Sequence, residues 1–149
     1  LRNSYTILLE FDIIAVENEL SDFAYFGDLN ARIAIRSGAS GAIINGATRD
    51  LEATKQLGFP IFAKSYNATD VRGRATLDSI NKPIVIENVT ITPGDLIFAD
   101  ECAIVVIYQR YIQDVLKKVN QTIDNEKNII NDILCNKDTQ TILSHRGNF

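Results

Sequence analysis

The residues best suited to chemistry are an adjacent cation and anion, Arg49 and Asp50, which close the stretch Gly41-Ala-Ile-Ile-Asn-Gly-Ala-Thr-Arg-Asp50. An arginine guanidinium binds a carboxylate through two parallel hydrogen bonds. An aspartate is a hard oxygen ligand for a cation such as Mg²⁺. Together they suit a small, anionic, metal-chelating substrate. A second interpretation is that Asp50 only favours the positive end of a following helix and that Arg49 is solvated.

Two predicted elements would position this pair. Residues 42–44 predict a buried strand, and Asn45-Gly46-Ala47-Thr48 predicts the loop at its carboxyl end, where α/β proteins usually bind ligands. Upstream, the pattern after Gly27 predicts a helix from Asp28 to about Ser37-Gly38. The unpaired N–H groups at its start would form an anion site. The alternative is that Asp28 is only an N-cap.

The rest of the chain predicts short strands and a few helices. A long amphipathic helix is predicted from about Tyr108 to Leu134. Its apolar stripe either packs on another subunit or only covers the sheet. The other predicted elements are the end of a helix at 1–10, strands at 11–16, 61–63, 84–86, 89–91, 96–98 and 103–107, helices at 51–57 and 139–143, and an irregular segment at 65–81.

Length and composition predict an ordinary globular protein. The 149 residues predict one domain over 1–149, with 46% hydrophobic and 23% charged residues. A net charge of −4 and a pI near 4.9 argue against a nucleic-acid partner, which would require a basic stripe. No apolar run is long enough to span a bilayer and no signal peptide is visible, so a cytoplasmic location without membrane association is expected.

The cysteines and the histidine give no support for other chemistry. Cys102 and Cys135 have no cysteine or histidine at ligand spacing, so both are predicted to be buried, reduced thiols. His145 is the only histidine and lies in a polar tail. A catalytic Ser-His or Cys-His arrangement and a zinc site are therefore not supported.

Four segments in the same order carry a family resemblance. They are Gly27-Asp-Leu-Asn30, Asn45-Gly-Ala-Thr-Arg-Asp50, Leu57-Gly-Phe-Pro-Ile-Phe-Ala63 and Asn88-Val-Thr-Ile-Thr-Pro-Gly-Asp-Leu-Ile-Phe-Ala-Asp100. With them the chain resembles the family that groups the regulator of ribonuclease activity A (RraA) with 4-hydroxy-4-methyl-2-oxoglutarate aldolase. The resemblance covers roughly the whole chain, although the family normally has further residues before Leu1.

The resemblance implies an α/β fold of the swivelling β/β/α type with C-terminal helices, assembled as a homotrimer or a hexamer. It implies a pyruvate-type site near a subunit boundary. By position, Gly27, Asp28, Leu29 and Asn30 match the substrate-binding helix start, Arg49 matches the substrate-binding arginine, and Asp50 matches the metal ligand.

The acid at position 50 favours the lyase branch, because regulatory members of the family lack it. One departure counts against activity: the aldolases usually carry an acid three residues after the aspartate, where this chain has Ala53. Whether Glu52 substitutes for that acid is left open by the sequence.

The expected function is that of a lyase dependent on Mg²⁺ or Mn²⁺, of the class II aldolase or oxaloacetate decarboxylase type. It would cleave a C–C bond of a small 2-oxo acid to give pyruvate. Arg49 and Asp50 are the expected catalytic residues, and no side chain stands out as the general base. The alternative is a non-catalytic regulator that binds a ribonuclease or another protein. The physiological substrate, the metal and the number of subunits cannot be deduced from the sequence.

Overall fold

The computed structural model describes residues 10–18, 20 and 22–147 in two compact units, Leu1–Pro93 and Gly94–Phe149. The two units are described separately below. The predicted helix at the N-terminus lies outside the described residues, apart from Glu10. The prediction of a single domain over 1–149 stays a prediction. Among the described helices, none has the length and apolar character required to cross a membrane.

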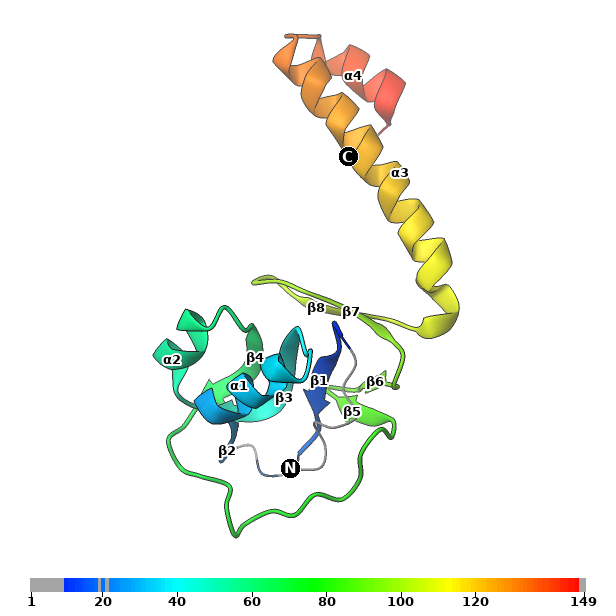
Figure 1. Cartoon of the computed structure of the whole chain (residues 1–149). Helices are drawn as coiled ribbons and strands as arrows, with labels where there is room; N and C mark the ends of the chain where they lie inside the picture. Colours follow the sequence, from blue (N-terminus) through cyan, green and yellow to red (C-terminus); the bar gives the residue numbers. More distant parts are fainter. Residues whose placement is uncertain (1–9, 19, 21, 148–149) are drawn as a thin grey trace. The chain divides into compact units, whose positions relative to one another are not determined.

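The first unit is built around a parallel sheet whose central strand is β3 (Figure 1). Strand β4 pairs along most of β3, while β1 pairs with its first half and β2 with its end, so β1 and β2 follow one another along the other edge. The strands are β1 (Ile13–Val16), β2 (Ala24–Phe26), β3 (Gly41–Thr48) and β4 (Ile61–Tyr66). Almost every residue of β3 is buried, as expected for a parallel strand covered on both faces.

Helix α1 (Asp28–Arg36) packs on this sheet through small residues. Ala31 and Ala34 are fully buried against the core, so the helix backbone lies close to the strands. Phe26 and Phe59 stack with ring centroids 6.2 Å apart in the same core. Helix α2 (Leu51–Gln56) follows β3 directly. Both helices confirm the predicted positions.

The predicted loop Asn45-Gly46-Ala47-Thr48 is wrong, because these residues continue β3. The pairing shifts between Ile44 and Ala47, so an irregularity in the strand accommodates the Asn-Gly pair instead of ending it. A Cβ at Gly46 would require the Asn18 side-chain amide, which lies against it, to move. Strand β2 was not predicted, since three residues carry too little periodicity to be recognised.

Two antiparallel hairpins confirm the predicted short strands. Strands β5 (Ile84–Ile86) and β6 (Val89–Ile91) form the first, within the first unit. Their turn residues Glu87 and Asn88 both have positive φ, as a tight two-residue hairpin turn requires. Strands β7 (Leu96–Ala99) and β8 (Ile104–Ile107) form the second hairpin, in the second unit.

The second unit continues through the 3₁₀ turn η2 (Gln109–Tyr111) into the long helix α3 (Ile112–Leu134), after which α4 (Thr139–Arg146) folds back along it (Figure 1). The prediction of buried cysteines is wrong: both thiols are free and exposed. Cys102 lies in the β7–β8 turn, where Asp100 accepts its N–H at 2.8 Å, and Cys135 caps the end of α3. Neither position faces a core.

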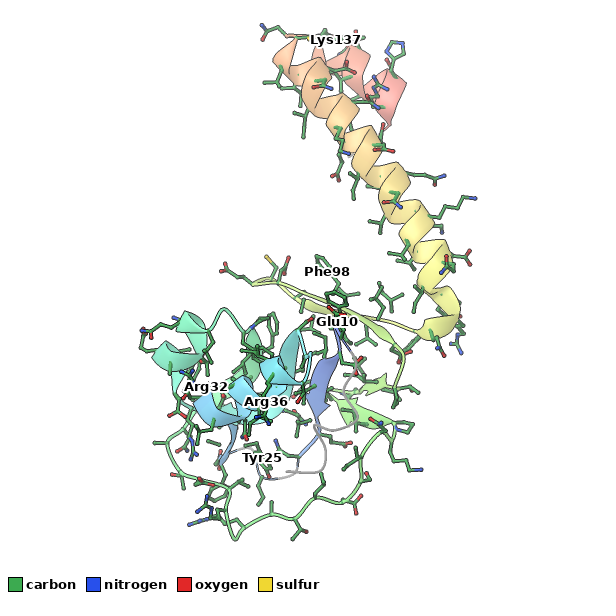
Figure 2. All side chains as sticks on the ribbon, viewed as in Figure 1. Glu10, Tyr25, Arg32, Arg36, Phe98 and Lys137 are labelled. Atoms are coloured by element: carbon green, nitrogen blue, oxygen red, sulfur yellow. The ribbon has the colours of Figure 1, made fainter. Side chains whose placement is uncertain are left out.

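Asp132 of α3 fixes the turn between α3 and α4 that Figure 2 marks by Lys137. Its carboxylate accepts from Lys137 Nζ at 2.6 Å and from Arg146 Nε at 3.0 Å, and its side chain is 11% exposed. The hydrogen bonds from Lys137 and Arg146 lower the pKa of Asp132 below its ordinary value. Because its pKa is lower in the folded state, the ionised Asp132 carboxylate stabilises the fold above about pH 4. This stabilisation is lost as the pH falls through the lowered pKa.

We therefore expect the α3–α4 contact to loosen on acidification below about pH 4. The methyl resonances of Ile142, which is buried in α4, should shift in that range in the wild type. In Asp132→Asn they should start displaced and show no such transition. Asp124→Asn, which removes an exposed partner of Lys127, is the matched control and should behave as wild type. An unchanged titration in Asp132→Asn would contradict the assignment.

Candidate anion and cation site

The start of α1 and the end of β3 meet at the carboxyl edge of the parallel sheet. Phe26 of β2 pairs with Thr48 of β3, so the residues that follow each strand come together. The Phe26 carbonyl accepts from the buried Thr48 Oγ1 at 2.9 Å and from the Arg49 N–H at 3.0 Å. These two hydrogen bonds to one carbonyl fix Arg49-Asp50 beside Gly27-Asp28.

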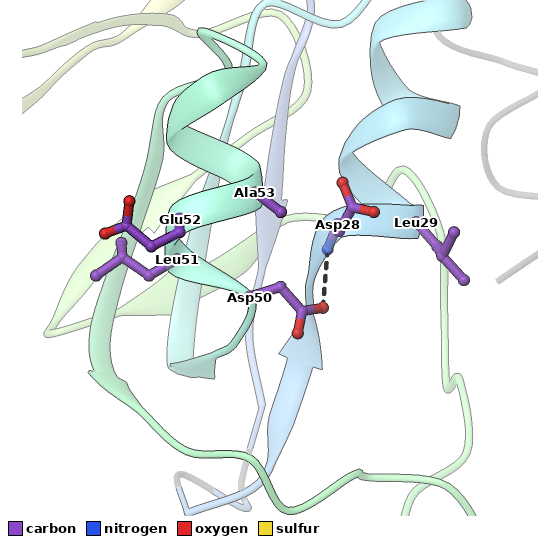
Figure 3. Close-up of a pocket in the computed structure, with 6 residues that line it drawn as sticks. All are labelled: Asp28, Leu29, Asp50, Leu51, Glu52 and Ala53. Carbon is purple, nitrogen blue, oxygen red and sulfur yellow. Dashed lines mark hydrogen bonds between the residues drawn. The ribbon is translucent and has the colours of Figure 1, made fainter.

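Asp50 joins the two loops through its side chain. Its backbone is left-handed, with φ 59° and ψ 40°, a conformation that aspartate tolerates better than most residues. Its carbonyl accepts the Thr54 N–H at 3.0 Å and so begins α2, but its carboxylate does not cap that helix. Instead Oδ2 accepts the Asp28 N–H at 3.1 Å (Figure 3). The first amide of α1 thus already binds a carboxylate, as a helix N-terminus favours.

Gly27 is the residue that permits this approach. It is buried and is the N-cap of α1, so the prediction that Asp28 could be the cap is corrected: Asp28 is the first helical residue. A Cβ at Gly27 would lie 2.6 Å from Asp50 Oδ2 and 3.0 Å from Arg49 Cγ. Its φ of −167° is extended backbone, so the requirement for glycine here is space rather than conformation.

We expect Gly27→Ala to push the Asp50 carboxylate off the Asp28 amide. Loss of a hydrogen bond worth about 1 kcal/mol should speed hydrogen exchange of that amide roughly fivefold. The thermal unfolding midpoint should change little, because alanine adopts the same φ. The Arg72 amide, which donates to Asp70 Oδ1 at 2.7 Å, is an internal reference that should not change. Unaltered exchange at Asp28 would show that the carboxylate tolerates the added methyl group.

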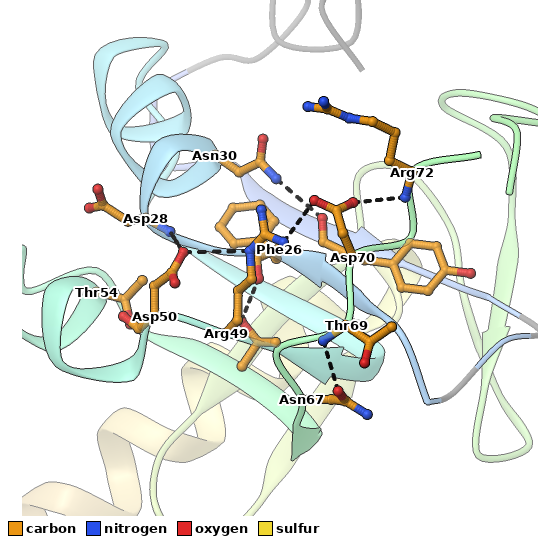
Figure 4. A network of polar contacts seen from close by, with 12 residues as sticks. Phe26, Asp28, Asn30, Arg49, Asp50, Thr54, Asn67, Thr69, Asp70 and Arg72 are labelled. Atoms are coloured by element: carbon orange, nitrogen blue, oxygen red, sulfur yellow. Dashed lines mark hydrogen bonds and ion pairs between the residues drawn. The ribbon is translucent and has the colours of Figure 1, made fainter. Parts of the chain in front are cut away.

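Arg49 bridges two carboxylates (Figure 4). Its Nη1 donates to Asp70 Oδ2 at 2.7 Å, and its Nε lies 3.6 Å from Asp50 Oδ2. The hydrogen bond from Arg49 is the main cause that lowers the pKa of Asp70, with a contribution from the Arg72 amide. Since a guanidinium has five N–H donors, Arg49 keeps donors for a ligand, and its side chain is 37% exposed.

Asp70 is the residue that sequence reasoning missed. It lies in the segment predicted only as irregular. It reaches Arg49 because residues 69–70 of that segment run beside β2, where the Ala24 N–H donates to the Thr69 carbonyl at 2.9 Å and Ala24 forms a β-bridge with Asp70. Nothing in the spacing of 65–81 signals such a contact, because the path of that segment is set by tertiary structure.

The other predicted binding residues have different surroundings. Leu29 is 73% exposed and lines the same pocket as Asp28. The Asn30 side chain points back along the chain, where its Nδ2 donates to the Tyr25 carbonyl at 3.2 Å. Asp28 Oδ1 pairs with Arg32 Nε one turn on, at 2.9 Å.

Asp50 and Leu51 line two open pockets. One, of about 630 Å³, is also lined by Asp28, Leu29, Glu52 and Ala53. The other, of about 620 Å³, is also lined by Arg49, Tyr66, Asn67 and Ala68. Figure 3 shows that Ala53 points toward the space beside Asp28, whereas the Glu52 carboxylate points away from Asp50. The geometry therefore gives Glu52 no role as a replacement for the acid missing at position 53.

The donor set fits a cation that keeps most of its water. Within the described residues no three histidine, cysteine, aspartate or glutamate side chains cluster as metal ligands. Asp50 Oδ2 accepts the Asp28 N–H, whereas Oδ1 accepts no hydrogen bond from any residue that the structure describes. Mg²⁺ is often bound through one or two carboxylates, waters and substrate oxygens. Asp50 alone would hold it here.

The charges around Asp50 are paired. The carboxylates of Asp28, Asp50 and Asp70 face the guanidinium groups of Arg32 and Arg49, and the charge of Arg72 also acts on Asp70, so the positive and negative charges of this cluster balance. The fold thus defines an α/β domain with a candidate ligand site at the carboxyl ends of its parallel strands.

The comparisons with known proteins give the family. Residues 8–106 match the model of the RraA-like family, described as Aldolase/RraA, and the chain belongs to that family. Its swivelling α/β fold with C-terminal helices is confirmed by solved RraA-like structures. One of them is Streptomyces coelicolor RraAS2, described as an unusual member of the RNase ES inhibitor RraA protein family. The two chains are 23% identical with a TM-score of 0.76, and the match covers 85% of this chain and 65% of the Streptomyces coelicolor chain. This likeness shows the fold alone.

Two relatives are more similar in sequence. Protein DlpA of Legionella pneumophila is 32% identical over 71% of this chain and 17% of its own length. A putative 4-hydroxy-4-methyl-2-oxoglutarate aldolase of Halalkalibacterium halodurans is 35% identical over 66% of this chain and 46% of its own length. The chain therefore spans less than half the length of either relative.

Proposed function

We propose that this chain carries the site of a divalent-metal-dependent lyase, which cleaves a C–C bond of a 2-oxo acid bearing a further carboxylate and releases pyruvate. The observation that carries the proposal is the position of Asp50: its carboxylate lies on the first amide of α1, next to Arg49, at the rim of two open pockets. The substrate class follows the name of the Halalkalibacterium halodurans relative, a putative 4-hydroxy-4-methyl-2-oxoglutarate aldolase.

The chain's own residues would bind and orient the substrate. The backbone N–H groups of Leu29 and Asn30, in the first turn of α1, lack intrahelical acceptors and would take the pyruvyl carboxylate. The remaining donors of Arg49 would hold the keto oxygen, where negative charge accumulates as the C–C bond breaks. Asp50 would hold the cation, which supplies Lewis-acid stabilisation of that charge. The same arrangement serves retro-aldol cleavage and decarboxylation of oxaloacetate, because both place the charge on the same oxygen.

The proposal is tested by pyruvate release from purified protein. Oxaloacetate and 4-hydroxy-4-methyl-2-oxoglutarate are each supplied with Mg²⁺, with Mn²⁺ and with EDTA. Heat-denatured protein is the blank, because free metal ions also decarboxylate oxaloacetate. We expect pyruvate above the blank only with a divalent cation. Release that persists in EDTA would contradict the metal dependence.

The second candidate is a non-catalytic regulator that binds a ribonuclease or another protein. Ala53 favours it, because the acid that the aldolases usually carry is missing and Glu52 points away from the site. In this case the assay gives no pyruvate with any substrate or metal. The acid at position 50 and the open pockets around it favour the lyase.

Asp70 is expected to position Arg49 for this reaction. In Asp70→Asn the charge of the contact with Nη1 is lost, so Arg49 is held less firmly and kcat should fall roughly tenfold. The Mg²⁺ concentration for half-maximal rate should not change, because Asp70 contacts Arg49 and not the open oxygen of Asp50. Asp78→Asn, an exposed acid in the same segment, is the control. A parallel rise in the Mg²⁺ requirement would mean that Asp70 belongs to the cation site instead.

A further inference from the structure

Two pockets meet at Asp50 and Leu51, which line both of them. We call them the α1 pocket and the β4 pocket, after the element beside each. In the proposed function the pyruvyl carboxylate lies at the start of α1, so a longer 2-oxo acid must place its far end in one pocket or the other. Besides Asp50 and Leu51, the α1 pocket is lined by Asp28, Leu29, Glu52 and Ala53, and the β4 pocket by Arg49, Tyr66, Asn67 and Ala68.

The lining of the α1 pocket is unfavourable for a second carboxylate. Among the described residues that line it are the acids Asp28, Asp50 and Glu52 and no basic residue. Arg32 pairs with Asp28 at 2.9 Å, but Glu52 has no ion pair with any residue that the structure describes. A carboxylate held near Glu52 would therefore meet a like charge and no donor side chain.

The β4 pocket has the opposite character. Its acid is Asp50 and its base is Arg49, whose guanidinium keeps donors beyond the one given to Asp70. Tyr66 is 62% exposed, and its hydroxyl makes no hydrogen bond with any residue that the structure describes. Tyr66 pairs with Thr48 in the register of β3 and β4, so it stands beside the residue that precedes Arg49. The pocket thus offers a guanidinium and a phenol from neighbouring strands.

The amide side chain in the lining of the β4 pocket is committed to the fold. Asn67 Nδ2 donates to the Asp22 carbonyl at 2.7 Å, and Asn67 Oδ1 accepts the Thr69 N–H at 2.8 Å (Figure 4). Its backbone N–H donates to the Thr48 carbonyl at 3.0 Å. These contacts hold the wall of the pocket against the end of β3. They leave Tyr66 as a side-chain donor in this lining that the fold does not use.

We propose that Tyr66 recognises the second carboxylate of the substrate in the β4 pocket, where its hydroxyl donates to that carboxylate beside Arg49. This inference rests on the proposed function for the position of the pyruvyl end, and it adds a specificity residue to that site. Tyr66 selects 2-oxo acids with a second carboxylate over monoacids. It also favours retro-aldol cleavage over decarboxylation, because the carboxylate stays charged in the product of the first reaction and leaves as neutral CO₂ in the second.

The test is the binding of pyruvate and of 2-oxoglutarate to the full chain with Mg²⁺, measured by isothermal titration calorimetry. The compound 2-oxoglutarate has a second carboxylate but no 4-hydroxyl group, so retro-aldol cleavage does not consume it. The wild type should bind 2-oxoglutarate more tightly than pyruvate. Tyr66→Phe should reduce this preference about tenfold, the loss expected for one hydrogen bond to a charged group. Tyr111→Phe, at another exposed tyrosine, is the matched control and should keep the wild-type preference.

The same variant should change the balance of the two reactions. In Tyr66→Phe, kcat/KM should fall about tenfold more for 4-hydroxy-4-methyl-2-oxoglutarate than for oxaloacetate, because the hydrogen bond to a persistent charge is lost. An equal fall for both substrates would mean that Tyr66 acts on the shared pyruvyl end, and it would overturn the inference.

Glu52→Gln distinguishes the two pockets. If the second carboxylate lay in the α1 pocket, this variant would strengthen the binding of 2-oxoglutarate while Tyr66→Phe left the preference intact, and the inference would be overturned. A wild type that binds both ligands equally would overturn it as well. Binding of neither ligand would contradict the proposed function and the Tyr66 site with it. Pyruvate release together with an unaltered preference in Tyr66→Phe would remove only the role of Tyr66.

Discussion

Asp50→Asn should abolish divalent-dependent pyruvate release while leaving the fold intact. Asparagine has the same shape and tolerates the left-handed backbone at this position, so the change removes charge without adding strain. The loss of the cation ligand and of its effect on the developing charge should cost on the order of 10³-fold in kcat/KM. The measurement is initial pyruvate release as a function of Mg²⁺ concentration.

Glu52→Gln is the matched control, since it removes another carboxylate from the lining of the same pocket. Its side chain points away from Asp50, so its rate should stay close to that of the wild type. If the two variants lost activity equally, Glu52 would be replacing the acid absent at position 53. Full activity in Asp50→Asn would remove Asp50 from the mechanism.

Arg49→Lys should have the second-largest effect, about 100-fold in kcat/KM, the loss expected when one preorganised donor is removed. The guanidinium spans Asp70 at 2.7 Å and Asp50 at 3.6 Å while keeping donors for the substrate. An ammonium group is a point charge and cannot serve these partners in the same geometry. Steady-state kinetics with a saturating divalent cation measure the effect.

Arg36→Lys, at an exposed position near the end of α1, controls for the exchange of one basic residue for another and should be neutral. If Arg49→Lys kept a near-normal rate, the planar fork would be unnecessary and Arg49 would be only a counter-ion for Asp70.

The elements around the site were largely predictable because their signals are local. The buried run at 42–44 and the pattern after Asp28 are strong enough to identify β3 and α1, and the chain order then places both loops at one edge of a parallel sheet. Gly27 was recognised by its place before a helix. Its steric role against Asp50 could be seen only in the structure.

What the sequence left undetermined depends on contacts distant in the chain. Asn45-Gly46 has the composition of a turn, yet the pairing of Ile44 and Ala47 on either side of it with β4 keeps it in β3. Asp70 has no local signal, because its approach to Arg49 follows from the path of an irregular segment beside β2. The cysteines were predicted to be buried from their residue type alone. They are exposed because both lie in turns at the surface.

A crystal structure of the chain with pyruvate and Mg²⁺ tests the central claim most directly. The proposed function predicts pyruvate between the first turn of α1 and Arg49, with its carboxylate on the Leu29 and Asn30 amides. It predicts a cation on Asp50 Oδ1 that is otherwise ligated by water and pyruvate. A cation bound elsewhere, or pyruvate bound outside these pockets, would contradict the proposal.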